Sequence, residues 1–367
     1  MKVLLISTSE QTGGGAIAAK RLLHALRSEG TDAKMLVRDK SSDEPSVVSY
    51  GNVFPKIRER LRLMYMMRCS LHKTWEYDLM TDGIDILSTK EYKEADIIHL
   101  HWVNQGMLSI KQLTSIANSG KKVFWTLHDE WPYLGFAHYE REDDRYHAIG
   151  TDRREYMTRS VPYNKIHFIG CSKWITDRAQ KALPTADVTH INNCVPQQLF
   201  HPISQQEARK ALNLPMDKHL VLFCAQNIND ERKGYRYLQD ALRQMPSIET
   251  LIIGQGGHSM SQDELPLAYS AADVFVTPSL CDNLPNTIAE SLSCGTPCVA
   301  FNVGGIPEMI QHGINGYLAT PRSTDDLAYG IRDTLLHPEY RKAAAESARH
   351  LFSPQNVAAA HLALYRK

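Results

Sequence analysis

The chain has 367 residues, 43% of them hydrophobic, which is enough for two domains with sizeable cores. Its 41 Lys and Arg residues balance 41 Asp and Glu residues, and this neutrality argues against a nucleic-acid partner. Seven cysteines without CxxC spacing indicate reduced thiols, and no His or Cys near them completes a zinc site. No apolar run is long enough to span a bilayer. We therefore expect a cytoplasmic protein without a bound metal.

The N-terminal part is predicted to be an α/β half. Strands are expected at Lys2–Ser7, Lys34–Val37, Ile97–Trp102, Val123–Leu127, Ile166–Cys171 and Val188–Ile191, with a helix at Lys173–Ala182. His128 directly follows one of these strands, and ligands bind at the carboxyl ends of parallel strands. His128 is therefore a candidate functional residue, with a structural histidine as the alternative. The charged stretch Glu130–Ser160 is expected to be a long loop that shapes a substrate site.

A glycine-rich turn, Gly13-Gly14-Gly15, precedes the first predicted helix. Glycine there allows backbone N–H groups to approach a phosphate or sugar, and the helix dipole favours an anion. The pattern Gly13-x-Gly15-x-x-Ala18 formally fits the dinucleotide fingerprint, so an oxidoreductase is one alternative function. In that fingerprint the glycines follow the strand at once, whereas here Thr8–Thr12 intervenes.

The segment Phe54–Arg68 is predicted to be helical and basic. It carries five basic residues and one Glu, and Phe54, Ile57, Leu61 and Met64 share one arc. One interpretation is a core-facing helix with solvated arginines. The other is a basic amphipathic helix that makes a peripheral contact with the inner face of a membrane through residues 54–68.

A second α/β half is predicted after the proline-punctuated linker Asn192–Pro202. It begins with a strand at Leu220–Ala225, and Arg232 and Lys233 stand at the start of the helix Tyr235–Gln244. Adjacent cationic groups at a helix N-terminus suit a diphosphate, with solvated surface charge as the alternative. Three further helices are expected near the C-terminus, at Thr324–Leu336, Glu339–His350 and Gln355–Tyr365.

The stretch from Pro278 to Glu308 concentrates candidate functional residues. It is predicted to follow the strand Val274–Thr277 with a loop, a helix that Asn286 caps, and the next strand, Pro297–Phe301. Loops at the carboxyl ends of parallel strands are ligand sites in open sheets. Asp282 and Glu290 are therefore both expected on the ligand side of one strand–helix connection.

These motifs together resemble the retaining family 4 glycosyltransferases of GT-B fold, and the resemblance covers nearly the whole chain. The family signature has a Pro-Ser strand end, a first Glu, seven residues, a second Glu and a Gly-x-Pro turn. Here these are Pro278-Ser279, Asp282, Glu290 and Gly295-Thr296-Pro297. Supporting matches are Asn192–Pro202, Tyr269–Ser279, Gly304–Glu308, Gly313–Tyr317 and His128-Asp129.

The resemblance implies two Rossmann-like, doubly wound domains that face each other across a cleft. Residues 1–195 would form the N-terminal, acceptor-side domain. Residues 196–353 would form the C-terminal domain, which binds the nucleotide-sugar donor. Residues 354–367 would form a helix that returns to the N-terminal domain.

The resemblance also assigns roles to residues. Glu290 would hold the ribose of a UDP- or GDP-sugar, and Asp282 would contact the sugar. Arg232 and Lys233 would neutralise the diphosphate. Gly14 and Gly15 would let the N-terminal domain close over the phosphates, and His128 would touch the reacting centre. Backbone groups of the next loop would assist, in residues Asn283, Leu284, Pro285 and Asn286. No metal and no cofactor are needed in this family.

The expected function is transfer of a sugar, with retention, to a saccharide or lipid-linked acceptor in surface polysaccharide or glycolipid biosynthesis. Two positions depart from the family pattern. The first signature carboxylate is Asp282 rather than Glu, and Asn227 stands where an Arg is common. These departures motivate an alternative, a non-catalytic subunit that binds a sugar nucleotide.

Overall fold

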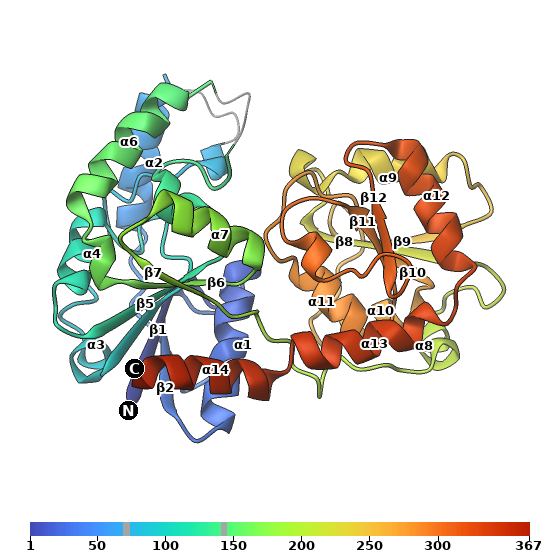
Figure 1. The fold of residues 1–367 in the computed structure, drawn as a ribbon, viewed down its shortest axis with the longest axis horizontal. Helices are drawn as coiled ribbons and strands as arrows, with labels where there is room; N and C mark the ends of the chain where they lie inside the picture. Colours follow the sequence, from blue (N-terminus) through green and yellow to red (C-terminus); the bar gives the residue numbers. More distant parts are fainter. Residues whose placement is uncertain (69–73, 141–144) are drawn as a thin grey trace. The chain divides into compact units, whose positions relative to one another are not determined.

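The computed structural model describes residues 1–68, 74–140 and 145–367, which form two compact units. The N-terminal unit comprises Met1–Asn192 and Val357–Lys367, and the C-terminal unit comprises Asn193–Asn356. Each unit is a parallel β-sheet flanked by helices (Figure 1). In the described part of the chain, no helix is both long enough and apolar enough to cross a membrane.

The N-terminal sheet has seven parallel strands in the order β3-β2-β1-β4-β5-β6-β7. They are β1 (Lys2–Ser9), β2 (Asp32–Asp39), β3 (Val47–Ser49), β4 (Ile97–Leu100), β5 (Lys122–Leu127), β6 (His167–Gly170) and β7 (Asp187–His190). After Lys2, every residue of β1 is buried, because a central parallel strand is covered on both faces. The predicted strands are confirmed to within a few residues, and β3 was missed.

Helices flank this sheet and complete the N-terminal unit. They are α1 (Gly14–Ser28), α2 (Phe54–Met66), α3 (Lys90–Glu94), α4 (Ile110–Ala117), α5 (Trp131–Leu134), α6 (His147–Ser160), α7 (Lys173–Ala182) and α14 (Pro354–Arg366). Short 3-10 turns occur at Thr74–Glu76 and Tyr163–Lys165.

The prediction of one long loop over Glu130–Ser160 is wrong, since α5 and α6 lie within it. Residues 141–144 of this stretch lie outside those that the structure describes. In α6 only Met157 is buried, so the sequence shows no apolar stripe from which a helix could be inferred. The packing of Met157, hydrogen bonds such as that from Thr114 Oγ1 to the Ser160 carbonyl (2.9 Å) and the contact of Arg153 with the Leu79 carbonyl attach α6 to the unit.

The C-terminal sheet has five parallel strands in the order β12-β11-β10-β8-β9. They are β8 (Leu220–Asn227), β9 (Glu249–Gln255), β10 (Val274–Thr277), β11 (Cys298–Phe301) and β12 (Gly316–Ala319). The helices are α8 (Gln205–Ala211), α9 (Tyr235–Leu242), α10 (Leu265–Ala271), α11 (Asn286–Ser293), α12 (Thr324–Leu335) and α13 (Tyr340–Leu351), with 3-10 turns at Glu231–Lys233 and Ile306–Glu308. The sequence missed β12.

The C-terminal helix α14 is anchored to the N-terminal sheet by Tyr365. The Tyr365 hydroxyl lies 2.6 Å from His99 Nδ1, and its ring centroid lies 4.9 Å from that of Phe124. Lys122 Nζ donates to the Tyr365 carbonyl over 3.1 Å. One turn earlier, His361 Nδ1 lies 2.8 Å from the Val357 carbonyl oxygen. Residues far apart in the sequence therefore share one buried core.

Four histidines in this region are held neutral in the folded protein. Burial lowers the pKa of His361 to about 4, and burial likewise lowers the pKa of His128 to about 4. Burial lowers the pKa of His99 and of His101 well below the usual value, and charge on the neighbouring histidines lowers it further. In the unfolded chain these histidines have a pKa of ~6.5. Between that pH and about pH 4, the unfolded chain therefore binds more protons than the folded protein does.

We predict that acidification from pH 7 to pH 5 destabilises the N-terminal unit, and that His361→Leu reduces the loss by about 2 kcal/mol. A group whose folded pKa is lowered from ~6.5 costs stability only as the pH falls below that value. Urea unfolding can be followed by tryptophan fluorescence, because all five tryptophans lie in this unit. An equal loss of stability in the variant and the wild type would contradict the prediction.

Candidate donor site

The two loops that carry the predicted charged residues meet at the carboxyl edge of the C-terminal sheet. Strand β8 pairs with β9 on one side and β10 on the other, so the strand order reverses between β8 and β10. Such a reversal is where open α/β sheets bind ligands. The loops following the two strands are hydrogen-bonded there: Leu280 N–H donates to the Arg232 carbonyl over 2.8 Å, and Arg232 Nη1 donates to the Cys281 carbonyl over 3.2 Å.

Two glycines allow the backbones around these loops to come into contact. Gly234 has φ +68°, and a Cβ there would lie 1.9 Å from the Pro278 carbonyl oxygen. Gly304 has φ +59°, and a Cβ there would lie 1.8 Å from the Asp282 carbonyl oxygen. The same oxygen accepts from Gly305 N–H over 3.2 Å. Only glycine satisfies both the left-handed backbone and this close approach.

The charged side chains form a cluster around Asp282. Lys233 Nζ donates to Asp282 Oδ2 over 2.6 Å, and Arg232 Nη1 lies 3.7 Å from the same oxygen. Arg232 Nη2 also donates to Asp230 Oδ2 over 3.2 Å. Burial alone would raise the pKa of the Asp282 carboxyl, but the charges of Lys233 and Arg232 outweigh it and lower the pKa. Asp282 is thus an ionised, buried carboxylate at neutral pH.

Glu290 lies in α11, four residues after the first residue of the helix. It is buried, and its Oε2 accepts from the Tyr269 hydroxyl over 2.9 Å. Burial raises the pKa of Tyr269 well above its usual value, and the nearby charge of Glu290 raises it further. The same two causes raise the pKa of Cys224 to about 12. Tyr269 thus remains a donor that orients the carboxylate. The sequence showed Tyr269 as part of a family match, but nothing in it indicated this contact.

The start of α11 differs in one detail from the prediction. Pro285, not Asn286, is the N-cap residue, and no side chain caps the helix. Asn286 is instead the first helical residue and is partly exposed, whereas Asn283, Leu284 and Pro285 are buried. The Asn283 backbone N–H contributes to holding Asp282 ionised. One backbone group of this loop, the Asn283 N–H, therefore faces the signature carboxylate.

In the N-terminal unit, the loop that precedes the glycine turn is held by Glu10. The Glu10 side chain is fully buried, and its Oε1 lies 2.6 Å from Lys20 Nζ of α1. Its Oε2 accepts from the backbone N–H groups of Ser41 and Ser42, over 2.7 and 3.0 Å. Burial alone would raise the pKa of Glu10, but the hydrogen bonds from Lys20 and the two serines lower it to about 2.

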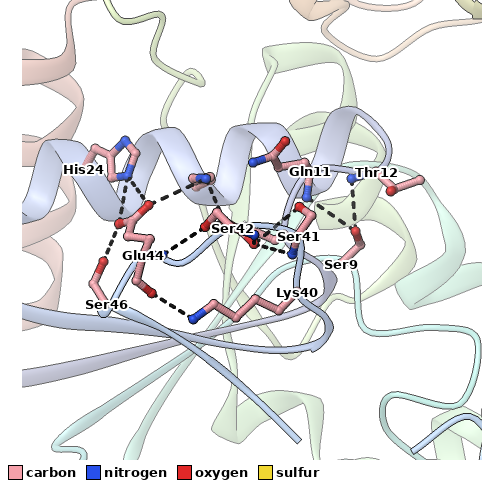
Figure 2. A network of polar contacts seen from close by, with 11 residues as sticks. Ser9, Gln11, Thr12, His24, Lys40, Ser41, Ser42, Glu44 and Ser46 are labelled. Atoms are coloured by element: carbon pink, nitrogen blue, oxygen red, sulfur yellow. Dashed lines mark hydrogen bonds and ion pairs between the residues drawn. The ribbon is translucent and has the colours of Figure 1, made fainter. Parts of the chain in front are cut away.

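Figure 2 shows that this network joins the loop after β1 to the loop after β2. Ser9 Oγ accepts from the Thr12 N–H over 3.0 Å, and Lys40 Nζ donates to the Glu44 carbonyl over 3.0 Å. Glu44 in turn binds His24 of α1 over 3.0 Å. The backbone entering Gly13 is thus fixed by side chains from three elements. No sequence pattern pointed to Glu10, because a single carboxylate after a strand is commonly solvated.

The structure brings Gly15 and His128 together. A Cβ on Gly15 would lie 3.2 Å from the His128 ring, so a larger residue there would require the imidazole to shift by a few tenths of an ångström. His128 Nε2 lies 3.0 Å from His101 Nδ1. Gly14 is the first residue of α1. With a pKa of about 4, His128 is a neutral hydrogen-bonding group rather than a base at pH 7.

The residue after His128 has a structural partner. Asp129 Oδ2 lies 2.7 Å from His138 Nδ1, and His138 Nε2 lies 2.8 Å from Asp78 Oδ2. Burial opposes a charge on this imidazole, but Asp129 and Asp78 outweigh it and raise the pKa of His138 to about 10. Across the ranges that the structure describes, no three His, Cys, Asp or Glu side chains gather as metal ligands do. Metal independence stays a prediction.

The fold and the site together define the class of protein. It has two parallel α/β units, and one of them carries a charged cluster where the strand order of its sheet reverses. Sucrose-phosphate synthase from Thermosynechococcus elongatus has a TM-score of 0.72 at 18% identity, covering 100% of this chain and 98% of that one. Anabaena HepE, crystallised with UDP and glucose, has a TM-score of 0.67 at 17% identity, and each chain is covered over 100%. These neighbours confirm the predicted GT-B fold class.

Sequence comparison then narrows the class. Residues 257–351, which include Asp282 and Glu290, match the family model described as glycosyl transferases group 1. The sulfoquinovosyl transferase SQD2 of Arabidopsis thaliana is 32% identical over 181 residues, which are 43% of this chain and 35% of that protein. The chain thus matches well under half of this relative's length. The matches support a relationship to the GT-B glycosyltransferase superfamily.

We predict that Gly304→Ala destabilises the C-terminal unit by about 3 kcal/mol or more, because the new Cβ would overlap the Asp282 carbonyl oxygen. Gly313→Ala is the matched control. It has a similar φ of +74°, but its Cβ would meet only the Tyr340 hydroxyl at 3.9 Å, so ~1 kcal/mol is expected. Calorimetric unfolding of the two variants measures the difference. Equal costs would show that the loop around Asp282 is not tightly packed.

Proposed function

We propose that the protein is a retaining, metal-independent glycosyltransferase that uses a nucleoside-diphosphate sugar. The acceptor is a saccharide or a lipid-linked saccharide, and the product belongs to surface polysaccharide or glycolipid assembly. The observation that carries the proposal is the cluster of Arg232, Lys233 and Asp282 at the switch point of the C-terminal sheet. It places two cations and an ionised carboxylate next to the helix that carries Glu290.

Each group in this cluster suits one part of the donor. Arg232 and Lys233 would bind the diphosphate and stabilise the charge that develops on it as the leaving group. Glu290, oriented by Tyr269, would accept hydrogen bonds from the vicinal hydroxyls of the ribose. Asp282 and the Asn283–Asn286 backbone would contact the sugar. The bound nucleotide of HepE, which shares the fold, supports a UDP-sugar as the first donor to test.

In the proposed reaction, the bond between the anomeric carbon and the diphosphate oxygen breaks first. The acceptor oxygen attacks the same face of the sugar, and a departing phosphate oxygen takes the acceptor proton. This chemistry needs positioning and electrostatic stabilisation more than a dedicated base. It agrees with a His128 whose pKa of about 4 leaves it neutral, as a hydrogen-bonding group in the N-terminal unit.

A specific contact favours the alternative, a non-catalytic sugar-nucleotide-binding subunit. The Asp282 carboxylate, assigned to the sugar, is already bound to Lys233 over 2.6 Å. Asp is also one methylene shorter than the usual Glu, so in this alternative the ion pair would keep the carboxylate from reaching the sugar. In that case the protein would bind a sugar nucleotide but transfer nothing.

Replacing Arg232 and Lys233 together with Ala is expected to weaken UDP binding about 100-fold, because each charge-assisted contact to a phosphate contributes ~1.5 kcal/mol or more. Binding of uridine, which lacks phosphate, should change little. The matched control is Arg236→Ala with Arg243→Ala, which removes two exposed cations from the same unit. Calorimetric titration of the wild type and of both double variants with each ligand measures these affinities. Unchanged UDP affinity in the first variant would exclude this phosphate site.

Substitutions of the two signature carboxylates should affect different kinetic parameters. Glu290→Gln is expected mainly to raise KM, because the ribose does not react and its contact serves ground state and transition state alike. Asp282→Ala should mainly lower kcat, because the sugar becomes oxocarbenium-like beside it. Asp282→Glu should retain activity. Release of nucleoside diphosphate, with and without acceptor, measures each variant.

The same assay decides between the two functions. Tight donor binding by the wild type without turnover on any acceptor or water, together with activity gained by Asp282→Glu, would establish the binding-subunit alternative. Turnover by the wild type that Asp282→Ala abolishes while donor affinity is kept would establish the enzyme.

A further inference from the structure

Helix α2 has its polar side toward the protein. Glu59 is fully buried, and its Oε1 accepts from the N–H groups of Leu79 and Met80 over 2.9 and 3.0 Å. Arg60 reaches inward to the Asp78 carboxylate and donates to the Thr74 carbonyl over 2.8 Å. Burial, then the charge of Asp78, raise the pKa of Glu59 to about 7, so this inward carboxylate is costly to keep.

The apolar side of α2 faces outward. Phe54, Leu61 and Tyr65 are 65%, 60% and 81% exposed, and Ile57 lies on the same face. Their spacing of three or four residues makes one stripe along about 16 Å of helix. Over half of the exposed large hydrophobic side chains in the described ranges lie between Tyr50 and Trp75. Of the two interpretations of this segment, the core-facing helix is therefore wrong for Phe54, Ile57 and Leu61.

An exposed apolar stripe on a helix fixed by buried polar contacts marks a surface at which the protein contacts a partner. The helix cannot rotate to bury the stripe, because that would expose Leu63 and break the hydrogen bonds of Glu59. The stripe is thus a property of the folded unit and not of a loosely attached segment.

The charges beside the stripe indicate which partner it fits. Arg58 and Arg62 are exposed next to Leu61. Both bind the single carboxylate of Asp82, and Arg58 Nε lies 2.9 Å from its Oδ1. Two guanidinium groups that share one carboxylate keep a net positive charge. Arg68, exposed just after the C-terminal end of the helix, adds to it. The apolar stripe therefore has a cationic border.

Aromatic side chains complete the pattern. Trp75 is exposed in the turn whose Thr74 carbonyl accepts a hydrogen bond from Arg60, so this turn packs against α2. Tyr65 and Trp75 have an apolar ring and a polar tip, which suits the boundary between headgroups and acyl chains. A self-contact through this face would be isologous and would bring Arg58 and Arg62 of two copies together. An anionic lipid surface has the opposite charge.

We propose that the outward face of α2, formed by Phe54, Ile57, Leu61 and Tyr65 with Arg58 and Arg62, lies on an anionic membrane. The apolar stripe is buried at the level of the headgroups, and the two arginines contact lipid phosphates. Such a surface would bring the protein to a lipid-linked acceptor. The proposal does not depend on the transfer reaction, since binding to vesicles is measured without turnover.

Vesicle co-sedimentation of the full chain tests the proposal, with phosphatidylcholine alone or mixed with phosphatidylglycerol. We predict that Leu61→Gln with Tyr65→Gln weakens binding to the anionic vesicles about tenfold. Tyr329→Gln with Leu336→Gln, which removes an exposed Tyr and Leu from the C-terminal unit, should leave it unchanged. Arg58→Gln with Arg62→Gln should also weaken it, and added salt should weaken the wild type.

Three results would overturn the proposal. The first is wild-type binding that is absent, or equal for neutral and anionic vesicles. The second is an equal loss of binding in the two apolar double variants. The third is a concentration-dependent dimer in light scattering that Leu61→Gln with Tyr65→Gln dissolves while vesicle binding is unchanged, which would assign the face to a second copy of the chain.

Discussion

The parallel pairing of β10 with β8 determines the geometry of the candidate donor site. Because the two strands are neighbours and run in the same direction, their following loops leave the sheet at the same edge. One loop carries Arg232 and Lys233, and the other carries Asp282. Hydrogen bonds from Leu280 to Arg232 and from Arg232 to Cys281 then fix the loops to each other. A change in strand order would separate charges that are adjacent here.

Compensation of buried charge is the second constraint. The Asp282 carboxylate is stabilised by Lys233, Arg232 and the Asn283 N–H. The Glu10 carboxylate is stabilised by Lys20 and by two backbone N–H donors. In both carboxylates the donors outweigh desolvation and lower the pKa. Glu59 is the contrast: it has two backbone donors but lies beside Asp78, and its pKa is raised. Buried carboxylates near the two candidate ligand loops are thus stabilised as anions, whereas Glu59 under α2 is not.

Much of the fold could be predicted from the sequence, because buried parallel strands are short apolar runs that end in turn residues. Strand Val274–Thr277 and helix Lys173–Ala182 were predicted with the observed bounds. The resemblance assigned Arg232, Lys233 and Asp282 to one bound donor, but nothing in the sequence predicted the direct contact of Lys233 with Asp282. Tyr269 was missed because its role depends on the position of α11, which no local pattern encodes.

Helix α2 shows a different limit of sequence reasoning. Periodicity correctly put Phe54, Ile57 and Leu61 on one face, but it could not show whether that face meets a core or the outside. Both environments select the same apolar spacing, and only the burial of Glu59 in the fold decides between them. The charged positions of α2 therefore say as much about which face of the helix is buried as the apolar positions do.

The ion pair between Lys233 and Asp282 bears on whether the site can hold a donor. An ammonium group has three donor hydrogens, so Lys233 can keep its 2.6 Å contact to Asp282 and still donate to a phosphate oxygen. Arg232 has five donors, of which the structure uses some on Cys281 and Asp230. Under the proposed function, the pair would orient the cations before a diphosphate binds and so lower the entropy cost of binding. It limits the reach of Asp282 more than it limits the affinity of the phosphate site.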